Sequence, residues 1–118
     1  MKLVKLSTAL IVVVLAVPIL LAACGGGGPK EQTFTIRIEG GKPAGGSTTF
    51  RVKQGDTVVF SISSDTEGEV HLHGYDLEEE IAPGKTATLT FTANATGRFL
   101  IEVEETEAEL GFLEVQPK

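Results

Sequence analysis

The sequence contains few of the residues that form cross-links and thiolate metal sites. Among its 118 residues are one cysteine, one methionine, two histidines and no tryptophan. A single cysteine excludes a disulfide bond within the chain. Basic residues are also scarce, because 16 acidic residues against 10 basic ones give a net charge of −6. An acidic protein repels the phosphate backbone, so we expect no nucleic-acid partner.

The N-terminal segment is apolar and has the order of a targeting signal. Residues 1–5 carry two lysines, residues 6–21 are almost wholly apolar, and Ala22-Ala23-Cys24 follows. A basic start, an apolar run and small residues are typical of a secretory signal peptide. A transmembrane helix is the alternative. The run is short for a helix that spans a bilayer, and Cys24 with four glycines follows it instead of a basic segment.

Leu21-Ala22-Ala23-Cys24 resembles the lipobox of bacterial lipoproteins. The resemblance implies that residues 1–23 are removed and that Cys24 is acylated, with fatty acids such as palmitate holding the protein in the membrane. The location would then be extracytoplasmic, on the cell membrane or the outer membrane. An ordinary signal peptide with an incidental cysteine is the alternative. Lipidation would occupy the only thiol, so no thiolate would remain for catalysis or metal binding.

Removal of residues 1–23 would make the rest of the chain more acidic. Without Lys2 and Lys5, eight basic residues oppose sixteen acidic ones, which gives a net charge of −8. Anionic lipid headgroups do not attract a domain with this charge, so the lipid at Cys24 would have to hold it at the membrane. We expect residues 24–32 to be a flexible glycine-rich tether and residues 33–118 to be the folded domain.

Residues 33–118 show the two-residue alternation of β-strands. The apolar side chains alternate with polar ones in segments 33–39, 48–53, 57–63, 69–75, 85–92, 98–103 and 111–115. Glycine, proline, asparagine and aspartate separate these segments, and residues 40–46 read as a long glycine-rich loop. We therefore predict an all-β fold, a Greek-key sandwich of two sheets with about seven strands.

Both histidines lie in segment 69–75. His71 and His73 alternate with Val70 and Leu72. If the two aliphatic side chains face the core, both imidazoles share the outer face of the strand. Two imidazoles at this spacing are able to converge on one metal ion.

The order of motifs from residue 33 to residue 115 resembles that of cupredoxins. Val52-x-x-Gly55-Asp56-x-Val58 resembles the family's first motif, and His73-Gly74-Tyr75 resembles the motif with the first copper ligand. Pro83-Gly84, residues 89–93 and Gly97-x-Phe99 then follow in the family's order. The resemblance implies a cupredoxin-like fold over nearly the whole mature domain.

The resemblance also implies ligands that this sequence does not have. Counted from Gly97, the family's cysteine position falls on Val103, and the following loop, residues 104–110, has neither histidine nor methionine. A blue-copper site requires a cysteine thiolate and two histidines. The sequence therefore predicts that this domain does not transfer electrons through copper and thiolate.

Three functions remain open for the histidines. In the first, His71 and His73 bind Cu(II) or Zn(II) for metal handling, with Glu104 and Glu105 completing the ligand set. This requires that loop 104–110 lies at the same end of the sandwich as His73. In the second, the domain binds no metal and is a binding or structural module with protein partners at the cell surface. An enzyme is the third, but no nucleophile motif or phosphate loop is present, so we do not expect catalysis.

Overall fold

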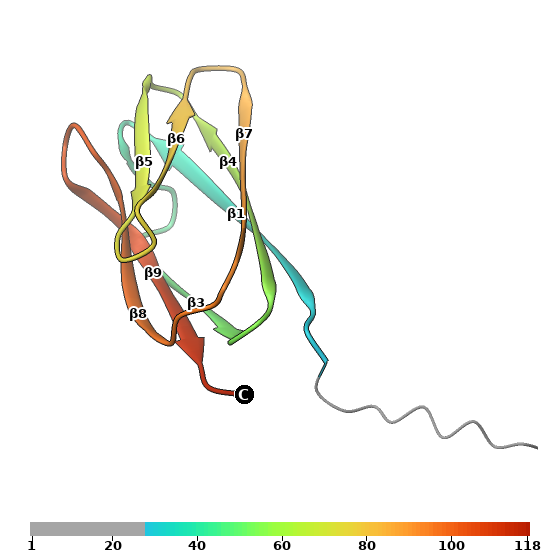
Figure 1. Cartoon of the computed structure of the whole chain (residues 1–118). Coiled ribbons are helices and arrows are strands. Elements are labelled where there is room, and N and C mark those ends of the chain that lie inside the picture. Colours follow the sequence, from blue (N-terminus) through green and yellow to red (C-terminus); the bar gives the residue numbers. More distant parts are fainter. Residues whose placement is uncertain (1–27) are drawn as a thin grey trace, which may run out of the picture.

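The structure, a computed structural model, describes residues 28–118 (Figure 1), so the predicted signal peptide and Cys24 lie outside the described residues. Every regular element in this part of the chain is a β-strand. These residues contain no helix that is long and apolar enough to cross a membrane. The strands are β1 (Glu31–Glu39), β2 (Lys42–Pro43), β3 (Thr48–Lys53), β4 (Thr57–Ser64), β5 (Gly68–Leu72), β6 (Leu77–Ile81), β7 (Thr86–Thr92), β8 (Gly97–Val103) and β9 (Ala108–Gln116).

The strands form two sheets that face each other. One sheet has the order β2-β1-β4-β7 and the other β3-β9-β8-β5-β6. Because the chain passes repeatedly from one sheet to the other, strands distant in sequence become neighbours, and β1 pairs with β4, and β3 with β9, in parallel. The predicted all-β Greek-key sandwich of two sheets is confirmed.

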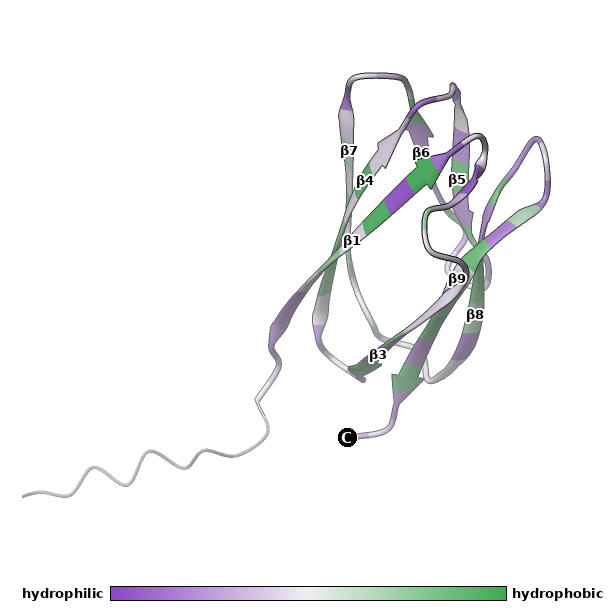
Figure 2. Cartoon of the chain, turned by 180° about the vertical axis from the view of Figure 1, so that it is seen from behind, coloured by the Kyte–Doolittle hydropathy of each residue, from purple (hydrophilic) through white to green (hydrophobic). Residues whose placement is uncertain are grey.

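The core lies between the sheets and is formed by the apolar side chains of each alternating strand. Figure 2 shows this alternation as apolar and polar bands along the strands. Rings from three strands meet there, with the centroids of Phe34 and Phe50 5.1 Å apart and those of Phe50 and Phe60 5.2 Å apart. The fully buried side chains of the core include Val58, Phe60, Ile62, Val70, Leu72, Ile101, Leu110 and Leu113.

Residues 28–118 contain nine strands where about seven were predicted, and some strand boundaries also differ from the prediction. The two additional strands are β2, within the glycine-rich loop, and β6, over residues 77–81. Strand β9 begins at Ala108, three residues before the predicted start. The histidine strand ends at Leu72 and not at Tyr75. The backbone turns there, with φ values of 80° at Gly74 and 51° at Asp76, and a left-handed backbone cannot continue a strand.

Asp56 is the buried charge that joins the start of β1 to the turn between β3 and β4. It is 4% exposed, and its carboxylate accepts hydrogen bonds from the backbone N–H of Lys30 (2.9 Å) and of Lys53 (3.0 Å). These two hydrogen bonds, of which the one from Lys30 has the larger effect, lower the pKa of Asp56 below its ordinary value. The ionised carboxylate therefore stabilises the point at which the two sheets are connected.

We predict that Asp56→Asn lowers the free energy of unfolding by about 1–3 kcal/mol. The amide nitrogen of asparagine cannot accept a hydrogen bond, so one of the two backbone N–H groups loses its acceptor. Because the folded-state pKa is lowered, this stabilisation is present above the unfolded-state pKa of about 4 and is lost as the pH falls through the folded value. Urea unfolding at pH 7 and pH 3 measures both effects. The control is Asp65→Asn, since the exposed Asp65 bonds only one N–H, that of Gly40. Equal losses in the two variants at pH 7 would contradict this role.

Candidate metal site

Strand β5 and the residue that follows it place both histidines on the outer face of the five-stranded sheet. Val70 is 1% exposed and Leu72 is fully buried, so the side chains between and after them point away from the core. The ring centroids of His71 and His73 are 4.3 Å apart and the ring planes are inclined by 33°. The prediction that the two imidazoles share one face is confirmed.

A tight turn holds His73 just after the end of β5. Its backbone N–H donates to the carbonyl of Leu100 on the neighbouring strand β8, at 2.9 Å. Gly74 follows with a φ of 80°, and a Cβ atom at this position would lie 2.3 Å from Cδ1 of Phe99. Only glycine combines this conformation with this close approach, so Gly74 and Phe99 together fix the direction in which the chain leaves His73.

Tyr75 fastens the same turn to the loop between β7 and β8. Its hydroxyl donates to the carbonyl of Ala95 at 2.8 Å and accepts from the N–H of Ala95 at 3.0 Å. Its ring packs against Phe99 and Phe91, with centroids 4.9 Å and 5.2 Å away. Tyr75 is therefore a structural residue that anchors the turn.

Three glutamates from the neighbouring strands surround the two imidazoles. Nε2 of His73 lies 2.5 Å from Oε1 of Glu102 on β8. Nδ1 of His71 lies 3.1 Å from Oε2 of Glu104, just after β8. On the other side, Glu78 of β6 is directly opposite His71 in the strand register. We call His71, His73, Glu78, Glu102 and Glu104 the histidine–glutamate cluster.

Two sets of three residues in this cluster have the geometry to hold a metal ion. One contains His71, His73 and Glu102, and the other contains His71, Glu78 and Glu104; in each, the ligand atoms lie within 4.8 Å of one another. Ligand atoms bound about 2.1 Å from one ion are about 3–4 Å apart. Small rotations of the side chains would therefore bring either set around an ion.

The structure brings together only part of the predicted ligand set. His71, His73 and Glu104 are in the cluster, whereas Glu105 belongs to neither group of potential ligands found within residues 28–118. Its Oε2 accepts a hydrogen bond from the N–H of Glu69 at 3.2 Å. Glu78 and Glu102 were missing from the prediction. Both are outward residues of strands next to β5, but the sequence alone does not show which strands pair.

The loop that follows β8 lies at the opposite end of β5 from His73, which differs from the prediction. It was expected at the same end of the sandwich as His73. Instead, the N–H of Glu104 donates to the carbonyl of Glu69 at the start of β5, whereas His73 follows the other end of that strand. Because β5 and β8 are antiparallel, the chain that leaves β8 returns to the first residues of β5. Glu104 contributes because it reaches His71 in the middle of the strand.

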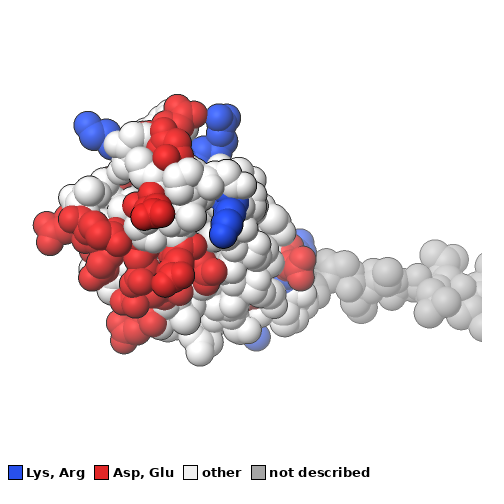
Figure 3. All heavy atoms as spheres, turned by 90° about the horizontal axis from the view of Figure 1, so that it is seen from above, with Lys and Arg blue, Asp and Glu red and all other residues white. Residues whose placement is uncertain are grey.

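The surroundings of the cluster are strongly acidic. Seen from above, carboxylates gather on one side of the molecule, away from most lysines and arginines (Figure 3). A side-chain hydrogen bond with Glu78 raises the pKa of Glu69, and partial burial and the neighbouring charges of Glu78, Glu104 and Glu105 add to this rise. Such crowding of negative charge makes a cation favourable at this surface.

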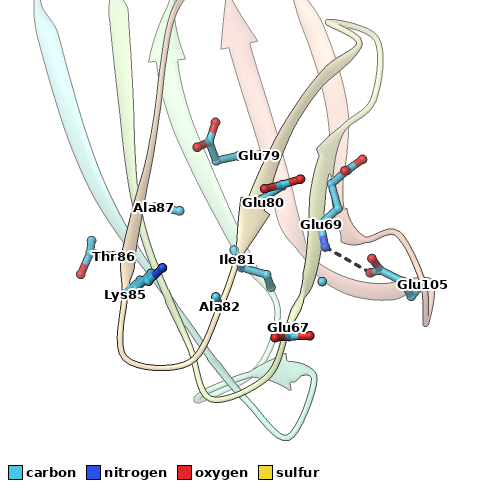
Figure 4. Close-up of a pocket in the computed structure, with 11 residues that line it drawn as sticks. Glu67, Glu69, Glu79, Glu80, Ile81, Ala82, Lys85, Thr86, Ala87 and Glu105 are labelled. Carbon is cyan, nitrogen blue, oxygen red and sulfur yellow. Dashed lines mark hydrogen bonds between the residues drawn. The ribbon is translucent and has the colours of Figure 1, made fainter.

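A shallow groove with a volume of about 760 Å³ lies beside the cluster, between the start of β5, the end of β6 and the start of β7. Figure 4 shows five glutamates around it together with one cation, Lys85. Neither histidine lines the groove. The imidazoles therefore act at an open sheet surface and not inside this groove.

The described residues do not fit a thiolate copper site. Residues 28–118 contain neither cysteine nor methionine. Val103, where the family's cysteine position falls by counting, is 3% exposed and packs in the core, while the imidazoles lie on the outer face. The nitrogen and oxygen atoms of the cluster suit a divalent ion such as Cu(II).

Several solved structures of copper proteins contain a domain with a similar fold. No protein-family model matches the sequence. The chain is similar to a heme-copper terminal oxidase, with a TM-score of 0.60 and 19% identity over 75% of this chain and 66% of that one. It is also similar to a multi-copper oxidase from Pseudomonas thermotolerans (TM-score 0.60, 15% identity, 76% and 30% coverage). A copper-containing nitrite reductase from Thermus scotoductus gives a TM-score of 0.51 at 16% identity, with 77% and 28% coverage.

These similarities define the class of the fold. The domain is a cupredoxin-like β-sandwich with two mixed sheets of four and five strands. The chain spans less than half the length of the multi-copper oxidase and the nitrite reductase. At these identities the similarity concerns the fold, and the function of this chain must be argued from its own side chains.

We predict that Tyr75→Phe lowers the free energy of unfolding by about 1 kcal/mol, because the ring contacts remain and only the hydroxyl's two hydrogen bonds are lost. Urea unfolding measures the change. Since the turn also carries His73, the backbone amide signals of residues 73–76 should broaden or shift in a proton–nitrogen NMR spectrum. An unchanged unfolding midpoint and unchanged amide signals would show that the hydroxyl does not anchor the turn.

Proposed function

We propose that this protein is a membrane-anchored, extracytoplasmic cupredoxin-like protein that binds Cu(II) or Zn(II) for metal handling. The observation that carries the proposal is the convergence of His71, His73 and Glu102, whose ligand atoms lie within 4.8 Å of one another. At a site with imidazole and carboxylate ligands, Cu(II) binds more tightly than Zn(II) by the Irving–Williams order. We therefore expect Cu(II) to be the preferred ion.

The proposed role is to hold, deliver or sense the ion and not to catalyse a reaction. The cluster lies on a sheet surface with little depth, and an open surface offers neither exclusion of water nor orientation of a substrate. The side chains of His73 and Glu104 are 42% and 49% exposed, so another molecule has direct access to the ion. Such access suits transfer of an ion to a partner.

The membrane anchor rests on the N-terminal sequence. Leu21-Ala22-Ala23-Cys24 supports acylation of Cys24, and the acidic surface around the cluster gives no reason to expect binding to anionic lipids by charge. The glycine-rich tether would let the domain stand clear of the bilayer. Partners would then be membrane lipid through Cys24, a metal ion and proteins at the cell surface.

A metal-free module is the alternative function, and one specific observation favours it. Both imidazoles already have carboxylate partners, Glu102 for His73 and Glu104 for His71. In that case the histidine–glutamate contacts would stabilise the outer face of the sheet and the domain would bind proteins. The two functions differ in whether a metal ion displaces these contacts.

We predict that the purified protein binds one Cu(II) ion, and Zn(II) more weakly, in calorimetric titrations, and that His71→Ala/His73→Ala abolishes this binding. Glu102→Gln should weaken it at least about tenfold, because a neutral amide oxygen is a weaker ligand for Cu(II) than a carboxylate oxygen. The matched control is Glu114→Gln, since Glu114 is a glutamate of the same sheet that contacts Arg51 and belongs to neither ligand set. Binding that the double variant keeps unchanged would exclude the proposed site and favour the metal-free module.

We predict that the protein is found in the membrane fraction of its bacterial host and that Cys24→Ser moves it out of that fraction or leaves the precursor uncleaved, because the thiol accepts the lipid. Metabolic labelling with palmitate, followed by electrophoresis, tests the same point. Label in the Cys24→Ser variant, or none in the wild type, would contradict acylation at Cys24.

A further inference from the structure

His71 is common to both potential ligand sets of the cluster. One set adds His73 and Glu102, and the other adds Glu78 and Glu104. A neutral imidazole has a single nitrogen lone pair, because its other ring nitrogen carries a proton. His71 can therefore serve one ion in one set at a time, and the two sets exclude each other.

The two sets differ in their exposure to solvent. In the first set, which we call the inner position, all three residues are partly buried, with side chains 17% (His71), 42% (His73) and 14% (Glu102) exposed. In the second set, the outer position, the residues Glu78 and Glu104 are both exposed. Two imidazoles and a shielded carboxylate bind Cu(II) more tightly than one imidazole and two hydrated carboxylates, so the inner position is the resting position of the ion.

The outer position is the more exposed of the two. It shares His71 with the inner position, and Oε2 of Glu104 is already 3.1 Å from Nδ1 of this residue. An ion that leaves His73 and Glu102 can therefore take up the carboxylate oxygens of the outer position while His71 still holds it. A stepwise exchange of ligands avoids the cost of releasing the ion from all its ligands in one event.

We propose that the cluster is a two-position metal exchange site, in which one divalent ion rests on His71, His73 and Glu102 and passes through His71, Glu78 and Glu104 on its way to and from solution. This inference rests on the proposed metal-binding function and adds its exchange route. The outer position sets the rate of transfer, and the inner position sets the affinity.

The test measures affinity and transfer rate on the same samples. The purified protein is loaded with one equivalent of Cu(II) and mixed in a stopped-flow instrument with an excess of a chelator such as EDTA. We expect Glu78→Gln/Glu104→Gln to slow the transfer at least about tenfold, with a change in equilibrium affinity of less than about threefold. Glu102→Gln should show the opposite result, weaker binding and faster transfer.

The control Glu80→Gln/Glu114→Gln removes the same charge from the same sheet, at residues in neither ligand set. It should transfer the ion at the wild-type rate. Transfer from Glu78→Gln/Glu104→Gln at the wild-type rate, an equal slowing in the control, or two bound ions per chain would overturn the exchange route although metal binding stands. Absence of Cu(II) binding by the wild type would instead overturn the proposed function itself.

Discussion

The burial of Val70 and Leu72 is the constraint on which the site depends. Each of these side chains contributes about 1.5–3 kcal/mol when it is removed from water, and both are at most 1% exposed. A shift of β5 by one residue would place two aliphatic side chains in solvent and two imidazoles in the core. The sheet therefore forces His71 and His73 onto its outer face side by side. The neighbouring strands then supply the carboxylates.

The fold was predictable because its main signal is local. The alternation in segments such as 57–63 and 98–103 identifies the inward residues without any knowledge of pairing, and Phe60, Ile62, Ile101 and Val103 are buried as expected. The two-residue strand β2 was not predictable, because Lys42 and Pro43 lie among glycines and are paired only through the end of β1. Strand boundaries that depend on tertiary pairing have no signal of their own in the sequence.

Glu104 was predicted as a ligand although its loop was expected at the other end of the sandwich, and the remaining predictable part of the site is its two histidines. Their spacing within one strand fixes that they lie on one face, but the carboxylates depend on strand order and register. Glu102 is 29 positions from His73, and only the pairing of β5 with β8 brings the two together. The position of Glu78 depends less on distant pairing, since β5 and β6 form a hairpin in which Glu78 is opposite His71. Glu105 was predicted as a ligand because it lies in the glutamate-rich loop after the residue aligned with the family's cysteine, but the returning loop carries it to Glu69.

Residues 28–118 form a cupredoxin-like sandwich without a thiolate, so the proposed copper site differs in its ligands from a blue-copper centre. Val103 is part of the core, and the donor atoms lie on an open sheet face instead. The most direct test of this account is pulsed electron paramagnetic resonance of the protein loaded with one equivalent of Cu(II). Two coordinated imidazole nitrogens in the wild type, and one in His73→Ala, would agree with it. A signal of hydrated Cu(II), or a spectrum that the His73→Ala substitution does not change, would contradict it.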